Sequence, residues 1–181
     1  MPIRFVAPGD TPSILSIYAP FISDSSVSFE LEVPGVTEMS QRIAAIARKY
    51  PWLVWEENGD ILGYAYASAH RDRKAYQWSC ETSVYLGPGS TRKGIGTQLY
   101  TRLFELLQQQ GMRNAYAGIT LPNPASEHFH ASFGFRKLCV YKGIGYKFGK
   151  WSDVLWMEKQ LPQPEEVAEP TWMYELYPDS R

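Results

Sequence analysis

The order of strand-like and helix-like segments is the feature that most restricts the fold of this chain. One short β-rich segment is followed by two helical patterns, then by three β-rich segments in a row, and only afterwards do helices and strands alternate. A doubly wound parallel sheet requires strict alternation, so this order excludes that fold and predicts a mixed α/β arrangement. Because 44% of the 181 residues are hydrophobic, the chain can bury a core of its own, which excludes disorder as its main state.

Local signals set the expected limits of these segments. Thr11 and Thr37 are expected to cap the first two helices, because their hydroxyls can accept a hydrogen bond from free backbone N–H groups. Asn58-Gly59 separates two β-rich runs and suits a tight turn with positive φ. A third helix follows a glycine-bearing loop, and Asn123 is expected to cap a fourth. The expected strands comprise residues 3–6, 52–56, 61–69, 76–86, 114–120, 135–141 and 154–159.

Charge, cysteine content and hydropathy exclude several classes of protein. The 18 basic and 19 acidic residues give a net charge of −1, whereas a protein that binds nucleic acid by bulk electrostatics is usually basic, so no nucleic-acid partner is expected. Cys80 and Cys139 have no CxxC or CxH neighbour, so we expect two reduced core thiols of a cytoplasmic protein and no metal site. No segment approaches the ~20 apolar residues of a membrane span, and residues 1–25 lack the apolar run of a signal peptide.

The last part of the chain differs in composition from the rest. Pro162, Pro164 and Pro170 argue for an irregular tail over residues 162–181. Trp172, Tyr174 and Tyr177 nevertheless predict that the end of the tail docks, either on the core of this chain or on a partner chain.

The loop between the strand at 76–86 and the third helix is the strongest candidate for a binding site. The first N–H groups of a helix are unpaired, and the helix dipole favours an anion beside them. Gly94 and Gly96 would let a phosphate approach the main chain closely, and two basic residues just before them add positive charge. Leu99 and Ile95 stand where the dinucleotide and P-loop motifs need glycine and lysine, so neither motif is present. The alternative is a plain glycine turn before a surface helix.

Two further segments contain side chains that can move protons. Glu81 lies inside a strand that is otherwise suited to burial, and a partly buried carboxylate can act as a general base near neutral pH. The alternative is a glutamate on a solvent-facing strand position. In residues 121–135, His128 and His130 are two positions apart and point in different directions on a helix, so they are not a metal-binding pair. Either histidine, taken alone, is more often structural than catalytic.

Together these segments resemble the GNAT acetyltransferases, and more narrowly the phosphinothricin and methionine sulfoximine or sulfone acetyltransferases. The resemblance covers residues 3–161 and therefore predicts one domain over 1–161 followed by the tail at 162–181. It implies a bent mixed sheet that splays at the fourth strand, with helices on both faces and acetyl-CoA in the cleft as co-substrate. The segments that carry it are residues 50–54, 75–78, 81–85, 92–96, 121–123, 130–135 and 146–154.

The resemblance implies how acetyl-CoA is held. Backbone groups of the fourth strand would pair with the pantetheine arm, and the N–H of Leu86 would polarise the thioester carbonyl. The glycine-bearing loop would hold the pyrophosphate, and Asn123 would contact the CoA arm. The implied cofactor-binding residues are Val84, Tyr85, Leu86, Arg92, Lys93, Gly94, Ile95, Gly96, Thr97 and Asn123.

The resemblance also implies the chemistry and the second substrate. Glu81 would take a proton from the substrate ammonium, directly or through water, and His130 would act as an acid toward the leaving thiolate or as a polar contact to the sulfur. Direct transfer is implied, without a covalent enzyme intermediate. Lys74 would pair with an anionic oxygen of the amino-acid substrate. The implied substrate-binding residues are Phe29, Glu30, Lys74, Ala75 and Tyr76.

The expected activity is acetylation of the α-amino group of a small amino-acid analogue such as phosphinothricin or methionine sulfone or sulfoximine. Detoxification is the implied role, and a homodimer in which the partner chain lies near the site is the implied assembly. Two alternatives stay open. The enzyme could act on another amine, such as a different amino acid, a polyamine or a protein N-terminus, or the chain could be a non-catalytic acyl-CoA-binding module.

Overall fold

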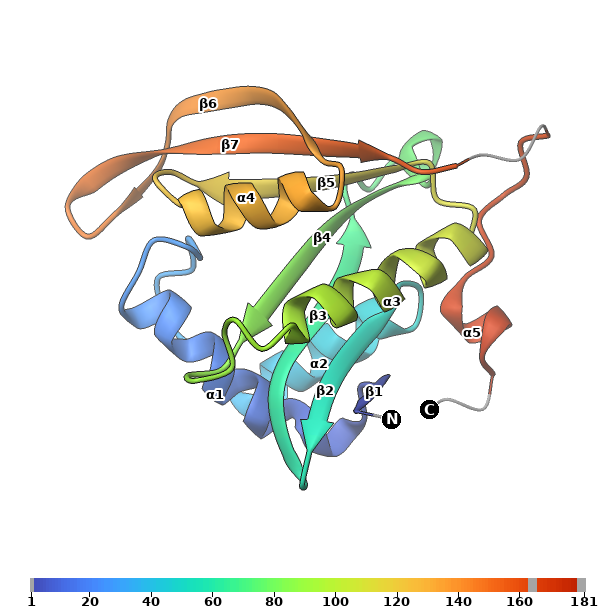
Figure 1. Ribbon diagram of the computed structural model, residues 1–181, viewed down its shortest axis with the longest axis horizontal. Helices are drawn as coiled ribbons and strands as arrows, with labels where there is room; N and C mark the ends of the chain where they lie inside the picture. The colour runs from blue at the N-terminus through green and yellow to red at the C-terminus, as the bar shows by residue number, and fades with distance from the viewer. Residues whose placement is uncertain (1, 163–165, 179–181) are drawn as a thin grey trace.

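The computed structural model describes residues 2–162 and 166–178, and within them one sheet of seven strands carries the fold (Figure 1). The strand order is β1-β2-β3-β4-β5-β7-β6, and every neighbouring pair is antiparallel except β4 with β5. The mixed α/β prediction is therefore confirmed. The strands are β1 (Ile3–Phe5), β2 (Trp52–Glu57), β3 (Asp60–Ala69), β4 (Ser79–Leu86), β5 (Asn114–Thr120), β6 (Arg136–Lys147) and β7 (Lys150–Gln160).

Helices cover both faces of the sheet, as expected (Figure 1). Successive side chains of a strand point to opposite faces, and in β2 Trp52 and Val54 pack with α1 and α2 while Leu53 packs with α3. Each face thus has its own apolar cluster, which anchors its helices. The elements outside the sheet are the 3-10 turn η1 (Pro8–Asp10), α1 (Thr11–Ser23), α2 (Val36–Ala47), the 3-10 turn η2 (Lys74–Tyr76), α3 (Ile95–Gln109), α4 (Pro124–Ser132) and α5 (Met173–Leu176).

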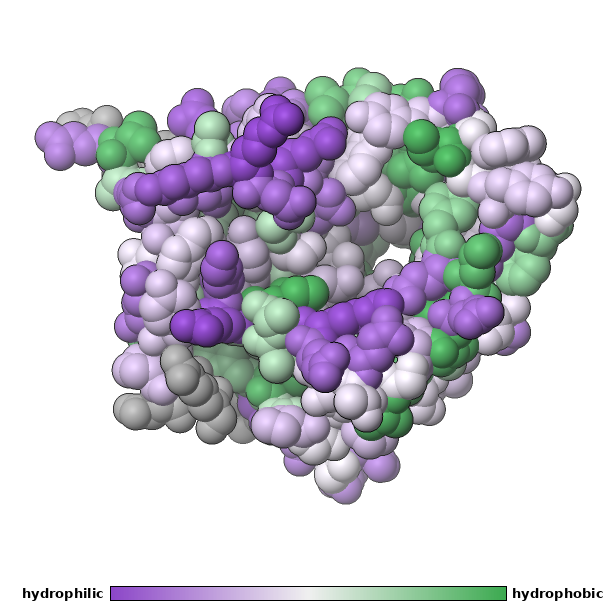
Figure 2. All heavy atoms as spheres, turned by 180° about the vertical axis from the view of Figure 1, so that it is seen from behind, coloured by the Kyte–Doolittle hydropathy of each residue, from purple (hydrophilic) through white to green (hydrophobic). Residues whose placement is uncertain are grey.

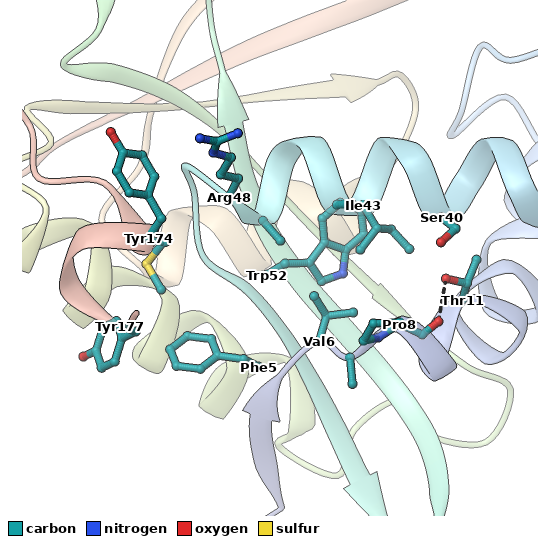
Figure 3. A pocket seen from close by; sticks show the side chains of 14 residues that line it. Phe5, Val6, Pro8, Thr11, Ser40, Ile43, Arg48, Trp52, Tyr174 and Tyr177 are labelled. Atoms are coloured by element: carbon teal, nitrogen blue, oxygen red, sulfur yellow. Dashed lines mark hydrogen bonds between the residues drawn. The ribbon is translucent and has the colours of Figure 1, made fainter. Parts of the chain in front are cut away.

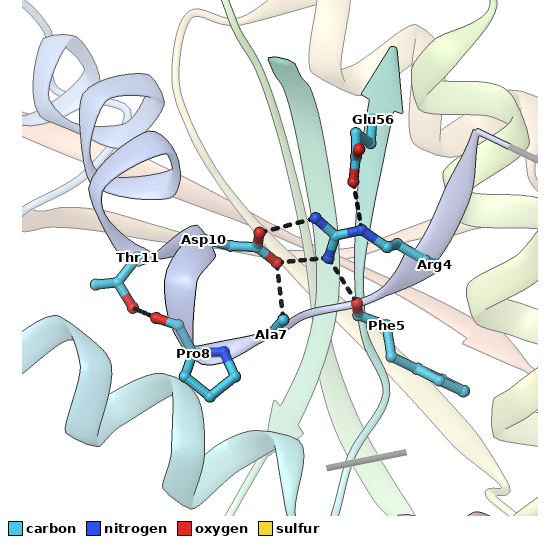
Figure 4. A network of polar contacts seen from close by, with 7 residues as sticks. All are labelled: Arg4, Phe5, Ala7, Pro8, Asp10, Thr11 and Glu56. Carbon is cyan, nitrogen blue, oxygen red and sulfur yellow. Dashed lines mark hydrogen bonds and ion pairs between the residues drawn. The ribbon is translucent and has the colours of Figure 1, made fainter. Parts of the chain in front are cut away.

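The beginnings of the first two helices differ from the sequence-based expectation. Thr11 is the first residue of α1 and Asp10 occupies the N-cap position, because η1 precedes the helix directly. The Asp10 carboxylate is held by the Arg4 guanidinium at 2.7 and 2.8 Å, and Arg4 also binds Glu56 on β2 (Figure 4). This network ties β1, β2 and the start of α1 together. In α2, Gly35 is the N-cap residue and no side chain caps the helix, so the expected cap at Thr37 is wrong.

The predicted β2–β3 turn and the predicted cap of α4 are both present in the structure. Asn58 and Gly59 both have positive φ, at 54° and 88°, which confirms the tight β2–β3 turn. Asn123 caps α4 by accepting a hydrogen bond from the Ser126 N–H at 3.1 Å. The expected strand at 76–86 begins only at Ser79, because η2 interrupts the extended chain. Strands β6 and β7 are longer than expected because a two-residue turn at Phe148 joins them directly.

The two cysteines have different environments. Cys80 is fully buried, as expected for a core thiol, and burial raises the pKa of its thiol to about 12. Cys139 is exposed, so the expectation of a second core thiol is wrong. The reason is that β6 is the outermost strand of the sheet, and most of its side chains face solvent. None of the helices within the described residues is long and apolar enough to cross a membrane.

The tail docks on the core of its own chain. The N–H of Met173 donates to the carbonyl of Lys49, and the N–H of Thr171 donates to the carbonyl of Gln110. The ring of Trp172 lies edge-on to that of Tyr50, with centroids 5.5 Å apart. Of the two alternatives for the tail, docking on this chain is the one that the described residues display.

Candidate active site

The sheet opens between β4 and β5. Strand β4 pairs with β3 as far as Leu86, but it pairs with β5 only over residues 79–81. Strand β5 instead pairs along its whole length with β7. Residues 82–86 of β4 therefore have no strand on their β5 side, which is the expected splay at the fourth strand. Figure 2, which shows the molecule from behind, has an open hollow between the part that contains β5 to β7 and the part that contains α1.

The backbone of β4 presents alternate residues to this opening. The N–H of Gly87 donates to the carbonyl of Leu62, which marks Leu62 and Gly87 as a hydrogen-bonded pair of the antiparallel ladder. Because such pairs alternate, the backbone groups of Tyr85 pair with β3, whereas those of Val84 and Leu86 point away from β3. The edge that faces the opening thus offers the N–H and C=O groups of Val84 and Leu86. Those of Tyr85 are already used.

The loop after β4 ends in a helix start without a side-chain cap. Gly94 is the N-cap residue of α3, with a φ of 77° that favours glycine. The first N–H groups of α3 have no partner within the helix, and Gly94 has no side chain to accept them. Arg92, Lys93 and Thr97 are exposed beside them. This arrangement suits an anion such as a pyrophosphate.

Gly96 packs inside the protein, whereas the sequence predicted that it would lie beside the phosphate. It is buried, and a Cβ built on it would lie 3.4 Å from the ring of Phe129 and 3.6 Å from Leu86. The absence of a side chain therefore lets the start of α3 pack closely against α4 and β4. Ile95 is also buried, and it belongs to the same core cluster as Leu99.

Glu81 lies at the point where the opening begins. It is the last residue of β4 that pairs with β5, opposite Tyr116. Its side chain is 37% exposed, and its Oε1 lies 3.0 Å from Nδ1 of His70. The His70 ring stacks on Tyr116, with centroids 4.4 Å apart, and lies edge-on to Trp156. The carboxylate is thus neither fully buried nor on an open face.

His130 is buried between α3 and α4. Its Nδ1 lies 2.8 Å from the carbonyl oxygen of Ser126, and its Nε2 lies 3.1 Å from the hydroxyl of Tyr100. Because a carbonyl only accepts, Nδ1 carries the proton of the neutral ring and Nε2 accepts from Tyr100. Burial lowers the pKa of His130 and outweighs the opposite effect of its hydrogen bond to Ser126. The neutral ring is therefore the favoured form, and it has no proton to give at Nε2.

Phe29 and Glu30 belong to the segment between α1 and α2, which lies against the β6–β7 hairpin. Glu30 forms an ion pair with Arg42 at 3.0 Å and accepts a hydrogen bond from the Tyr18 hydroxyl. A Cβ on Gly145 would lie 2.2 Å from the Phe29 ring, so the hairpin packs on this segment without space to spare. The buried Lys147 of the hairpin donates to the carbonyls of Ile22 and Ser28. These contacts hold Phe29 in place.

The remaining candidate residues for the second substrate lie in η2 and contact the tail. Nζ of Lys74 forms an ion pair with Glu169 at 2.8 Å, and both side chains are largely exposed. Close by, the indole N–H of Trp78 donates to the carbonyl of Ala168. Tyr76 is exposed. Lys74 therefore contacts the tail in this structure and not Glu81.

A cavity of about 460 Å³ lies elsewhere, between β1, η1, α2 and α5 (Figure 3). Its walls are mainly apolar, with Trp52 and Ile43 on one side and Tyr177 and Phe5 on another. None of the residues that the sequence singled out for catalysis or for acetyl-CoA lines it. We therefore place the candidate site at the β4–β5 opening and not in this cavity.

Sequence reasoning missed His70 as a member of the site. The signal was present in the β3–β4 pairing, where Ala69 lies opposite Cys80. Extending that register by one residue puts position 70 opposite Ser79, diagonal to Glu81 on the same face. Tyr100 was also missed, because its hydrogen bond to His130 joins residues 30 positions apart on two helices.

Proteins of similar sequence and structure include several acetyltransferases. Residues 3–156 match the acetyltransferase (GNAT) domain family. The chain is 36% identical to the phosphinothricin N-acetyltransferase of Streptomyces coelicolor, over 86% of this chain and 95% of that protein. It is 32% identical to the L-methionine sulfoximine/L-methionine sulfone acetyltransferase of Salmonella typhimurium, over 90% and 96% of the two chains. The structure of a phosphinothricin acetyltransferase from Sinorhizobium meliloti in complex with AcCoA is similar with a TM-score of 0.86 and 33% identity, covering 94% of this chain and 97% of that one.

Proposed function

Because the chain belongs to the GNAT acetyltransferase family, we propose that it transfers the acetyl group of acetyl-CoA to the α-amino group of a small anionic amino-acid analogue. Phosphinothricin and methionine sulfone or sulfoximine are the proposed substrates. Support for this choice comes from relatives of both names that match most of the chain. The observation that carries the proposal is the joint position of Glu81 and the Gly94 helix start at the β4–β5 opening.

In this proposal the opening binds acetyl-CoA. The free backbone groups of Val84 and Leu86 pair with the amides of the pantetheine arm, as an added strand would. The pyrophosphate lies at the first N–H groups of α3, where Arg92 and Lys93 add positive charge. The thioester then reaches the deep part of the opening. Leu86 donates its N–H to the carbonyl oxygen as negative charge develops there.

The reaction is a direct transfer. Glu81 accepts a proton from the substrate ammonium, directly or through a water, and the freed amine attacks the thioester carbon. The nitrogen loses its second proton as the C–N bond is completed and the C–S bond breaks, and the leaving thiolate gains one proton through solvent, so the products are the N-acetyl compound, CoA thiol and protonated Glu81. For His130 we propose that it holds the Tyr100 hydroxyl in place and does not act as an acid, because its Nε2 accepts from Tyr100 in the neutral ring.

We also propose a homodimer that uses the β6–β7 hairpin. This hairpin exposes several large apolar side chains, and exposed apolar patches mark protein interfaces. The exposed residues are Leu138, Val140, Tyr141, Ile144, Tyr146, Phe148 and Trp151. Light scattering after gel filtration tests this: the wild-type protein should have the mass of a dimer, and Trp151→Glu should shift it toward the 20.6 kDa monomer.

The activity is tested by following thiol release from acetyl-CoA over a panel of amines. The panel contains phosphinothricin, methionine sulfone, methionine sulfoximine, the common amino acids, spermidine and a peptide. A clear rate with the first three compounds supports the proposal. A rate with another amine alone would keep the chemistry and overturn the substrate, and binding of acetyl-CoA without turnover would indicate a binding module.

A further inference from the structure

His70 lies beside the proposed base but has no part in the mechanism described so far. We propose that His70 is a positioning residue, which holds one carboxylate oxygen of Glu81 and leaves the other to face the reacting amine. This inference rests on the proposed function, because it assigns a partner to the base of that reaction. It starts from the 3.0 Å contact between Nδ1 of His70 and Oε1 of Glu81.

A hydrogen-bond partner is needed to hold the carboxylate of the proposed base, Glu81, in one position. The Glu81 side chain has three rotatable bonds and is about one-third exposed, so without a fixed contact it can adopt several rotamers. Among the described residues, His70 supplies the hydrogen bond that fixes Oε1, and no hydrogen bond to Oε2 is present. One oxygen is therefore anchored and the other can accept a proton.

The His70 ring is itself held in one orientation. It stacks on Tyr116 with an interplanar angle of 25°, and it meets Trp156 at 77°. Tyr116 belongs to β5, where it pairs with Glu81 of β4, and Trp156 belongs to the next strand of the sheet, β7. The ring is thus held by side chains of β5 and β7 while its Nδ1 faces the carboxylate on β4. The position of the Glu81 carboxylate therefore depends, through His70, on the positions of Tyr116 and Trp156.

The direction of the hydrogen bond follows from the chemistry of the two groups. A carboxylate can only accept, so Nδ1 of His70 carries the hydrogen and donates it to Oε1. Asparagine places an amide nitrogen at nearly the same distance from its Cα as Nδ1 of histidine, because both nitrogens are bonded to Cγ. Phenylalanine keeps the aromatic ring but has no donor. The two substitutions therefore separate the hydrogen bond from the stacking.

The experiment compares His70→Asn, His70→Phe and His70→Ala in the thiol-release assay. If His70 positions Glu81, the Asn variant keeps kcat within about fivefold of wild type. The Phe and Ala variants then lose on the order of 100-fold in kcat, the cost expected when a reacting group is misplaced by about 1 Å. The KM for acetyl-CoA stays unchanged in all three, because His70 does not contact the proposed cofactor site. If the Phe variant is active and the Asn variant is as slow as Ala, stacking is what matters and the proposal is overturned.

A second measurement does not depend on turnover. The ¹⁵N spectrum of the imidazole reports which ring nitrogen carries the proton. We expect the Nδ1–H form in the wild type and a changed Nδ1 signal in Glu81→Gln, where the acceptor is weaker. An Nε2–H form that does not respond to Glu81→Gln would overturn the positioning role. If no amine is acetylated, the proposed function fails, and this spectrum still decides whether His70 holds Glu81.

Discussion

The start of α3 offers the sharpest test of where acetyl-CoA binds, through the substitution Gly94→Ala. Gly94 has a φ of 77°, and a Cβ built on it would meet only Nε2 of Gln98, at 3.9 Å. Gly89 in the same loop provides a matched control. Its φ is 73°, and a Cβ there would meet nothing within 4 Å. Neither substitution creates a clash, so both place the same backbone strain on the loop.

The two variants should lose the same stability but different affinity. A residue with a Cβ pays about 1–2 kcal/mol for the left-handed region, which lowers Tm by about 2–8 °C in a chain of this size. At Gly94 the added methyl group also stands beside the free N–H groups of α3. Loss of one hydrogen bond to a phosphate costs about 1.5–3 kcal/mol, which raises the Kd for acetyl-CoA about 10- to 150-fold.

Calorimetric titration with acetyl-CoA measures the Kd, and a thermal melt of each unliganded variant measures the strain. We expect similar Tm values for Gly94→Ala and Gly89→Ala, with a Kd near that of wild type for Gly89→Ala alone. Equal Kd values for the two variants would refute the assignment of the pyrophosphate to the first turn of α3. A much lower Tm for Gly94→Ala would show that the reasoning on strain is wrong.

Three further predictions concern the base, the tail and the N-terminal network. Glu81→Gln should lower kcat by about 10²- to 10⁴-fold with an unchanged Kd for acetyl-CoA; a normal rate at pH 7 would remove Glu81 as base. If Lys74 binds the substrate anion, Lys74→Ala should raise the KM for the amine while Glu169→Gln, which frees Lys74, should lower it; unchanged KM values would contradict that role. Burial alone would raise the pKa of Asp10, but hydrogen bonds from Arg4 and a backbone N–H outweigh it, so the pKa is lowered. The stability that the Asp10 carboxylate contributes is therefore complete above its unfolded pKa of about 3.9 and lost as the pH falls through the lower folded value, so the urea midpoints of wild type and Asp10→Asn should converge below about pH 4.

The glycine-bearing loop illustrates how far a motif can be interpreted without coordinates. From the sequence, Gly94 and Gly96 were both predicted to let a phosphate approach the main chain. In the structure Gly94 has positive φ at the helix start, whereas Gly96 is buried against Phe129. The difference depends on where α4 packs, and α4 begins 28 residues after Gly96. A local pattern contains no information about such a neighbour.

His130 and Lys74 show the same limit for side chains. The resemblance placed His130 at the sulfur of CoA and Lys74 at an anionic oxygen of the substrate, and the sequence alone could not give their partners within the protein. Burial between α3 and α4 joins His130 to Tyr100, and docking of the tail joins Lys74 to Glu169. Each contact links residues that are at least 30 positions apart.

The sequence by itself determined the features that depend on neighbouring residues. These are the order of helices and strands, the positive φ at Asn58-Gly59, and the Asn123 cap, because a few consecutive residues decide backbone torsion and local hydrogen bonds. Only the tertiary structure decided that β5 leaves β4 after Glu81 to pair with β7, and that His70 meets Glu81 beside Tyr116. Which strands pair, and which distant side chains meet, depends on how the apolar faces of the sheet and helices are buried together. That burial joins segments far apart in the chain.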